Sequence, residues 1–258
     1  MKTLTCIRVK KMSAMSIIKA AEAHGRRLDE ASARRVDRSR TGLNLAASQY
    51  SPDDPLSLET AFRAFKKQTG AVEGKGAAIM AHMIAVISPE VLAEAGDPRD
   101  PDNPKVRLLF DQAQAWARSE FGESALVAAR LDVDEAGAGV VDLFVCPTAM
   151  QAGGRGRKPK LTISIKSGIE AVAARYPSPA SEDGSPLLNK HGKPVQKRSY
   201  SGLQDSWGEW ASQNIDPRLR RGKPKTETGL DHVHADLFRA EKQALTEQQQ
   251  QLAARAAE

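Results

Sequence analysis

The chain has 258 residues, of which 40% are hydrophobic and 27% are charged, and its formal net charge is +6 at pH 7. These values are ordinary for a folded, soluble protein. No apolar run approaches the roughly 18–20 residues that cross a bilayer, and Lys10 and Lys11 interrupt the N-terminal segment where a signal peptide would be apolar. We therefore expect a cytoplasmic protein that does not associate with membranes.

The two cysteines, Cys6 and Cys146, lie among apolar residues. They indicate buried thiols in a reducing compartment, and two cysteines alone cannot make a zinc cage. The length suits one large domain, which we place at residues 1–225, followed by a helical tail at residues 226–258.

The charge is distributed in blocks along the chain. Residues 1–50 carry 11 basic and 4 acidic side chains, residues 51–150 carry 9 and 16, and residues 151–225 carry 15 and 6. Two basic blocks around an acidic one suit a protein that grips a phosphate backbone with two surfaces and keeps carboxylates elsewhere, around a cation. An unevenly charged, solvated surface is the alternative.

Hydrophobic periodicity predicts the elements of the N-terminal half. Alternating residues predict a strand at Thr3–Val9, and a helix follows at Ser16–Arg27. Residues 28–55 are polar, basic and rich in turn formers, which predicts a long loop held by something that it binds or packs against. Ser57 is the expected N-cap of a short helix. The wholly apolar Ala77–Ile87 predicts a buried strand.

A helix and a hairpin are predicted for the middle of the chain. Lys105–Gly122 has the pattern of an amphipathic helix, and Gly122 ends it. Ala125–Val133 and Val140–Cys146 flank a turn of small residues, so we expect an antiparallel hairpin near the centre of a sheet.

The remaining segments are a basic loop, a short strand and two helical patterns. Leu161–Ile165 predicts a strand after the Gly-rich basic loop, and residues 177–198 are too poor in apolar side chains to predict order. Ser201–Asn214 predicts a helix with its tryptophans near one face. From Asp231 the chain has a helical, Gln-rich pattern, which suggests an exposed C-terminal helix through which two copies could associate.

Three stretches resemble, in the same order, the MobV/Pre family of plasmid mobilisation and recombination relaxases. In AHGRRLDEASARRVDRSRTGLNL, His24 and Arg27 match the family's His-x-x-Arg, and residues 36–44 resemble its Ile-Asp-Pro-Ser-Arg-Ser…Asn loop. FGESALVAARLDVDEAGAGVVDLFVCP resembles the family's metal-binding hairpin, and SYSGLQDSWGEWASQNIDPRLRRGKPK resembles its Leu-Gln helix and Arg-Gly turn. The resemblance covers roughly residues 3–225.

This resemblance implies an α+β fold of the His-hydrophobe-His nuclease type, in which helices flank a central, five-stranded antiparallel sheet. It also implies that a divalent metal on the central hairpin polarises a scissile phosphate of single-stranded DNA. His24 would be the nucleophile, and Arg27 would stabilise phosphate charge or orient His24. An adjacent guanidinium should lower the imidazole pKa and favour its neutral, nucleophilic form.

The hairpin departs from the family pattern at its metal ligands. Residues 130–147 contain no histidine, although the family has one before its Asp-Glu pair and two after it. Asp134 and Glu135 match the pair, Arg130 or Asp132 stands at the preceding histidine, and residues 140–142 replace His-x-His. The remaining oxygen ligands are suited to Mg²⁺ or Mn²⁺, and they come from Asp132, Asp134, Glu135 and Asp142. Solvated carboxylates without a metal are the alternative.

The other histidines are weaker candidates. His82 lies in the apolar strand and is expected to be a satisfied core or sheet residue. His232 and His234 lie in a helical pattern, where their rings would point in different directions.

Three basic clusters are expected to contact DNA, because Arg and Lys in Gly-rich loops suit phosphate binding. They comprise Arg34, Arg35, Arg38 and Arg40 with Asn44, then Arg155, Arg157, Lys158 and Lys160, and finally Arg220, Arg221 and Lys223.

Three functions remain open from the sequence. One is a relaxase that binds an origin-of-transfer-like site, as hairpin, single strand or duplex, and nicks one strand through His24. The second is a catalytically inactive descendant that acts as a sequence-specific DNA-binding regulator of transfer, replication or transcription. The third is a protein-interaction scaffold that works through the C-terminal helix.

Overall fold

The structure is a computed structural model, and it describes residues 3–153, 158–181 and 183–223 together with residues 244, 247, 248 and 250. The chain divides into two compact units, Met1–Gly222 and Lys223–Glu258, and the fold below is that of the first. Within the described residues, no helix is both long and apolar enough to cross a membrane. The predicted C-terminal helix, with His232 and His234, lies almost wholly outside the described residues, as do Arg155 and Arg157.

A six-stranded sheet forms the centre of the fold, in the order β2-β4-β5-β3-β1-β8. Its strands are β1 (Leu4–Met12), β2 (Leu45–Ala47), β3 (Met80–Ile87), β4 (Leu126–Leu131), β5 (Val140–Val145) and β8 (Arg220–Arg221). All neighbours are antiparallel except β8, which runs parallel to β1. The predicted α+β class and the inner position of the β4–β5 hairpin are confirmed. The family resemblance implied five strands, and the sixth is the two-residue edge strand β8.

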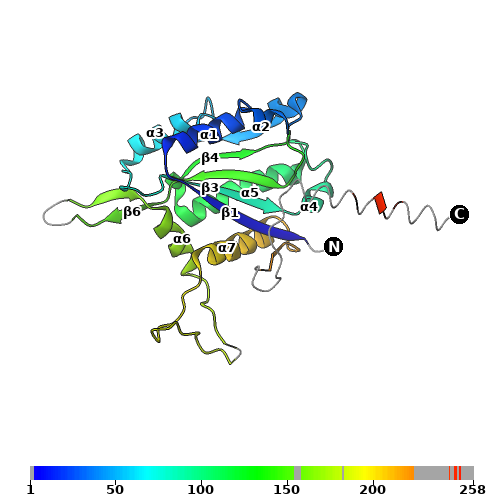
Figure 1. The fold of residues 1–258 in the computed structure, drawn as a ribbon. Helices are drawn as coiled ribbons and strands as arrows, with labels where there is room; N and C mark the ends of the chain where they lie inside the picture. Colours follow the sequence, from blue (N-terminus) through cyan, green and yellow to red (C-terminus); the bar gives the residue numbers. More distant parts are fainter. Residues whose placement is uncertain are drawn as a thin grey trace. The chain divides into compact units, whose positions relative to one another are not determined.

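Helices cover both faces of this sheet (Figure 1). α1 (Met15–Gly25) and α3 (Leu58–Thr69) lie on one face, and α5 (Pro104–Phe121) and α7 (Ser199–Asn214) lie on the other. α5 begins where Asn103 accepts a hydrogen bond from the backbone of Lys105 and Pro104 takes the first helical position, a place where proline's missing N–H is harmless.

Burial alternates along β3, and this alternation distinguishes the two faces of the sheet. Ala81, Met83, Ala85 and Ile87 are fully buried, whereas His82, Ile84 and Val86 are partly exposed. Successive side chains of a strand point to opposite faces, so the second set defines the more open face. In register on β1, Cys6, Arg8 and Lys10 lie opposite Val86, Ile84 and His82 and share that face.

Residues 28–55 differ from the single long loop that their composition predicted. They form α2 (Glu30–Ala33), the 3-10 turn η1 (Arg38–Leu43) and β2. Asp29 caps α2 by accepting a hydrogen bond from the backbone of Ser32, and Asp37 caps η1 in the same way. Hydrogen bonds from short polar side chains therefore stabilise α2 and η1, which the apolar periodicity did not predict.

The remaining elements lie at the periphery. They are α4 (Pro89–Ala93), the 3-10 turn η2 (Glu123–Ala125), α6 (Ile165–Ala173), and the two-stranded sheet of β6 (Thr148–Gln151) and β7 (Lys160–Ile163). Residues 177–198 carry two isolated bridges, Ala180 to Pro186 and Leu188 to Pro194, so this segment has more local structure than its composition predicted.

Candidate functional site

A cavity of about 210 Å³ lies where the C-terminal end of α1 meets the β4–β5 hairpin and β3. Its polar lining consists of His24, His82, Asp132, Glu135 and Asp142. These residues come from three separate parts of the chain. The antiparallel register brings them together, because β5 lies between β3 and β4.

His24 stands in the last turn of α1 with a partner at each ring nitrogen. The Ser32 hydroxyl lies 2.5 Å from Nδ1 and itself donates a hydrogen bond to the Asp29 carboxylate. On the cavity side, Nε2 is 3.6 Å from Glu135 Oε1. Ser32 thus fixes the ring, and Nε2 is the nitrogen that a ligand in the cavity would meet.

The pKa of His24 is raised, contrary to the sequence-based expectation. Its interaction with Glu135 is the main cause, and burial and the charges of Arg130 and Arg27 oppose it. Arg27 therefore acts in the predicted direction, but Glu135 outweighs it.

Arg27 is buried beside the cavity in an unusual backbone conformation. Its φ of 57° makes it the only non-glycine residue with positive φ among the described residues, and its side chain is 4% exposed. Nε and Nη2 donate to Asp134 at 3.0 and 2.6 Å, and Nη1 donates to Glu135 at 3.2 Å. A left-handed conformation of a non-glycine residue persists only where surrounding contacts stabilise it. At Arg27 the paired hydrogen bonds to Asp134 provide this stabilisation.

Asp134 connects the η1 loop to the hairpin. Its side chain is fully buried and accepts a 2.8 Å hydrogen bond from the Thr41 hydroxyl in addition to those from Arg27. Burial alone would raise the pKa of Asp134, but these hydrogen bonds outweigh it and lower the pKa. Asn44 accepts from the backbone of Val133 and Asp134, and Arg40 donates to the Val133 carbonyl. Asn44 and Arg40, which are predicted to bind DNA, also hold the loop against the hairpin through these hydrogen bonds.

Arg130 lies beneath the cavity between two carboxylates, and its side chain is only 4% exposed. Its Nη2 is 2.5 Å from Asp142 Oδ2, and its Nε is 3.0 Å from Asp132 Oδ2. Gly25 makes room for it, because a Cβ at that position would collide with Arg130 Nη1.

His82 completes the cluster from β3. Its Nε2 is 2.8 Å from Asp142 Oδ1, and its ring stacks on Phe144 at 4.8 Å. Burial alone would raise the pKa of Asp142, but His82 and Arg130 lower it to about 2. His82 is therefore satisfied, as predicted, yet it also lines the cavity. Its role was invisible in sequence because its partner lies 60 residues away.

The four predicted metal ligands are not gathered around one point. Asp134 is bound by Arg27, and both oxygens of Asp142 face His82 and Arg130. The one group among the described residues that brings three ligand atoms within 4.8 Å is His24, Asp132 and Glu135.

The surroundings of this smaller group determine whether it can hold a divalent cation. Asp132 Oδ1 favours an ion, because it is buried without a hydrogen-bond partner. However, Asp132 Oδ2 already contacts Arg27 at 2.9 Å and Arg130 at 3.0 Å, and Glu135 Oε1 accepts from Arg27. A cation there would lie against two guanidinium groups that it repels. The arrangement does not fit a divalent metal.

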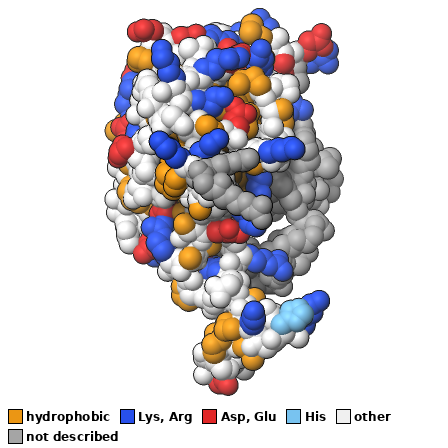
Figure 2. Space-filling model, turned by 90° about the vertical axis from the view of Figure 1, so that its left-hand side faces the viewer, with side chains coloured by type: hydrophobic (Ala, Val, Ile, Leu, Met, Phe, Trp, Pro, Cys, Tyr) orange, Lys and Arg blue, Asp and Glu red, His pale blue; other side chains and the backbone are white. Residues whose placement is uncertain are grey.

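The predicted DNA-contacting residues do not all converge on this site. Arg34, Arg35 and Arg38 are exposed in and beside α2 and η1, near the hairpin, because Val36 forms a bridge with Glu135. Lys158 and Lys160 are exposed at β7, which belongs to the separate two-stranded sheet, and Lys223 is exposed just beyond β8. Lys and Arg side chains are also numerous on the end of the molecule shown in Figure 2.

Arg220 and Arg221 do not line the His24 cavity. They form β8, at the edge of the sheet opposite to β2. Arg220 donates to the Pro217 carbonyl, and Arg221 pairs with Asp205.

Arg8 and Lys10 are basic residues that the sequence analysis did not single out. Both are exposed on the open face of the sheet, in register with Ile84 and His82. Arg8 and Lys10 are two residues apart in β1, so the sequence alone predicts that they share one face of the strand. Only the register with β3 shows that this is the open face of the sheet.

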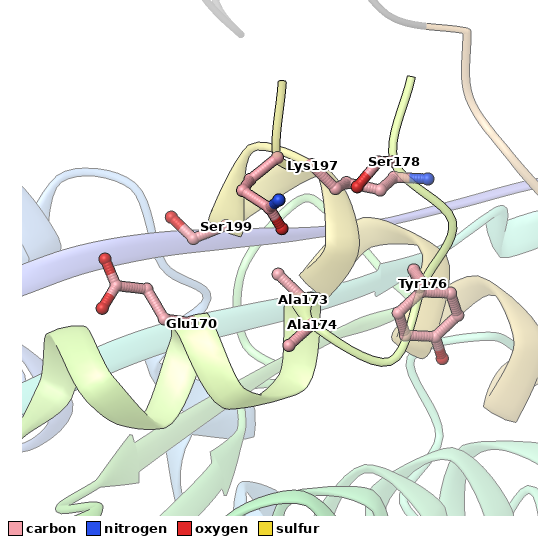
Figure 3. Close-up of a pocket in the computed structure, with 8 residues that line it drawn as sticks. Glu170, Ala173, Ala174, Tyr176, Ser178, Lys197 and Ser199 are labelled. Carbon is pink, nitrogen blue, oxygen red and sulfur yellow. The ribbon is translucent and has the colours of Figure 1, made fainter. Parts of the chain in front are cut away.

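A second cavity, of about 310 Å³, lies between α6 and the start of α7 (Figure 3). Two of its polar groups have other partners, because Lys197 pairs with Asp205 and the Tyr176 hydroxyl donates to Glu209. It is larger than the His24 cavity, but it contains no histidine and no Asp side chain in its lining. The chemistry therefore favours the His24 cavity.

These features define a class of fold: a relaxase-type α+β domain, with a histidine at a helix end facing the central hairpin of the sheet. No protein-family model and no curated protein matches the sequence. Among solved structures, the fold is that of the MobM relaxase domain (MOBV; Mob_Pre). One such structure, Mn-bound and in complex with 22 nucleotides of plasmid pMV158 oriT DNA, shares 15% identity with a TM-score of 0.59. That match covers 92% of this chain and 98% of the MobM chain.

A second MobM structure, bound to 26 nucleotides of the same oriT DNA, shares 13% identity with a TM-score of 0.52. It covers 91% of this chain and 99% of that chain. The likeness to MobV/Pre relaxase domains confirms the predicted fold over most of the chain.

Proposed function

We propose that this chain is a relaxase-like DNA-binding protein of plasmid mobilisation or recombination, and that it nicks one strand at an origin-of-transfer-like site. The observation that carries this proposal is the setting of His24, with Ser32 at Nδ1 and Glu135 near Nε2. This arrangement occurs on a fold shared with relaxase domains whose structures contain oriT DNA.

The geometry supports a proton-balanced cleavage step. Because the His24 pKa is raised, the resting ring is protonated more readily than free imidazole, and Glu135 must first accept the Nε2 proton. The freed lone pair attacks phosphorus, an N–P bond forms, and the bond from phosphorus to the 3′ oxygen breaks. The departing oxygen takes the proton from Glu135, while Nδ1–H stays bonded to Ser32. The protein remains joined to the 5′ end of the cut strand.

Arg8 and Lys10 extend this site into a DNA-binding surface. Exposed cations on an open sheet face can follow a phosphate backbone without selecting a sequence. Each phosphate contact contributes about 0.7–0.9 to the slope of log K against log salt concentration. Arg8→Ala and Lys10→Ala should therefore weaken binding and each reduce this slope, whereas Lys166→Ala on α6, whose side chain is 78% exposed, should leave it unchanged.

A strand-transfer assay tests the proposed cleavage. The full chain is incubated with a supercoiled plasmid that carries its own upstream region, in Mg²⁺, in Mn²⁺ and in EDTA. Relaxed circles and a covalent protein–DNA adduct are expected, and His24→Ala should abolish both. His191→Ala is the matched control, because His191 is exposed in the 177–198 segment. Tight, salt-sensitive binding without any adduct would instead support the inactive, DNA-binding regulator.

A further inference from the structure

We infer that Arg130 takes the place of a divalent cation in this site, as an internal cation that neutralises Asp132 and Asp142 so that a phosphate can approach His24. This inference rests on the proposed function and names the charge on which phosphate binding depends. Arg130 does not line the cavity itself. It is a positioning residue that acts through the two carboxylates above it.

Arg130 lies between two carboxylates of the cluster. Arg130 contacts one oxygen of Asp142 at 2.5 Å and one oxygen of Asp132 at 3.0 Å, and its side chain is 4% exposed. Two carboxylates that face one cavity repel each other and any phosphate unless a cation lies between them. A guanidinium supplies a permanent positive charge, because it does not lose its proton in proteins.

The surroundings of Arg130 leave room for a guanidinium. A side chain at Gly25 would collide with Arg130 Nη1, so the guanidinium requires the glycine that immediately follows His24. On the far side, His82 takes the other oxygen of Asp142 at 2.8 Å and leaves one oxygen for Arg130.

Every carboxylate of the cluster already has a basic partner. Arg27 binds Asp134, His24 faces Glu135, Arg130 contacts Asp132, and His82 contacts Asp142. The carboxylates of this cluster therefore do not need a metal ion as a partner. We therefore expect DNA binding and adduct formation to persist in EDTA.

Mn²⁺ binding tests the inference without DNA. The wild-type chain is titrated with Mn²⁺, with free ion followed by electron paramagnetic resonance, beside Arg130→Met and Arg130→Lys. We expect no saturable binding to wild type and none to Arg130→Lys. Arg130→Met should gain a saturable site, because Asp132 and Asp142 both lose Arg130 as a partner, and only Arg27 remains as a guanidinium beside Asp132. Mn²⁺ should raise the Tm of this variant and leave the wild-type Tm unchanged.

A second variant keeps the charge and moves it. Gly25→Ala places a methyl group against the guanidinium, so displacement of Arg130 should also open the carboxylate pair to Mn²⁺. Gly42→Ala, at a position of η1 with open space around it and outside the lining of the His24 cavity, is the matched control and should behave as wild type.

The outcomes separate the inference from the proposed function. Saturable Mn²⁺ binding to wild type that Asp132→Asn abolishes would overturn the role of Arg130, even if an adduct then formed with Mn²⁺. An adduct that forms equally in EDTA and in Mn²⁺ would support both. Failure to bind or cleave DNA, together with the expected Mn²⁺ results, would overturn the proposed function and leave Arg130 as the internal cation.

Discussion

The buried pair of Arg27 and Asp134 should be strongly coupled, and a double-mutant cycle measures that coupling. Arg27→Met removes the two hydrogen bonds to Asp134, of 2.6 and 3.0 Å, and leaves the fully buried Asp134 carboxylate without its cation. Removal of one partner of a buried ion pair costs about 3–5 kcal/mol. Asp134→Asn in the same background removes the orphaned charge, so the double variant should lose far less than the sum of the single variants. We expect a coupling of roughly 2–3 kcal/mol.

The assay is urea unfolding at pH 7 followed by circular dichroism. Arg63 and Glu59 provide the control cycle, because they form a 2.7 Å pair on α3 in which the arginine side chain is 66% exposed. Exposed pairs of this kind contribute about 0.3–0.5 kcal/mol. A coupling for Arg27 and Asp134 no larger than that of the control would refute the reasoning.

The coupling should also depend on pH. The pKa of Asp134 is lowered in the folded protein. A lowered carboxyl pKa gives stability that is present above the unfolded value of about 4 and is lost as the pH falls through the folded value. The measured coupling should therefore be largest near pH 7 and shrink under acid conditions.

Three further predictions concern the same cluster and its hairpin. Glu135→Gln should lower the His24 pKa toward its ordinary value, as measured by NMR titration of the ring, and an unchanged pKa would contradict the assigned cause. The raised pKa of His24 gives stability that is present below about pH 6.5. This stability is lost as the pH rises through the folded pKa. Gly139→Ala should destabilise the fold by more than about 1 kcal/mol, because its φ is 76° and a Cβ would lie 2.5 Å from a backbone carbonyl of β3; Gly137→Ala should stay within about 0.5 kcal/mol of wild type. Asp142→Asn should reduce the decrease in the free energy of unfolding between about pH 4 and the folded pKa of about 2. An unaltered acid-unfolding curve would argue against the ion pair of Asp142 with Arg130.

The sequence predicts the elements whose signals are local. The periodicity of residues 105–122 gave the helix that became α5, and the small-residue turn between two apolar runs gave the β4–β5 hairpin within two residues at each boundary. Both depend on side chains close together in the chain, so no knowledge of register is needed.

The site was only partly predictable, because its decisive contacts join distant residues. Arg27 and Asp134 are 107 residues apart, and His82 and Asp142 are 60 apart. The family resemblance pointed to His24 and Arg27, but no spacing rule places Arg130 between two carboxylates. That placement depends on β4 and β5 lying side by side and on the missing side chain of Gly25.

The same limit applies to the basic residues. Arg40 and Asn44 are predicted to contact DNA because they lie in a polar, Arg-rich loop. In the structure, their side chains form hydrogen bonds with backbone groups of the hairpin. Arg8 and Lys10 look like ordinary strand residues until pairing with β3 assigns them to the open face.

The edge strand β8 has a consequence for how the chain is made. Leu4 pairs with Arg220, so β1 gains its outer neighbour only after the more than 200 residues between them have been translated. Contacts that close so long a loop are slow to form. During synthesis β1 therefore has an unprotected edge, and removal of residues 220–221 should leave the finished protein with that same edge open to pairing with another chain.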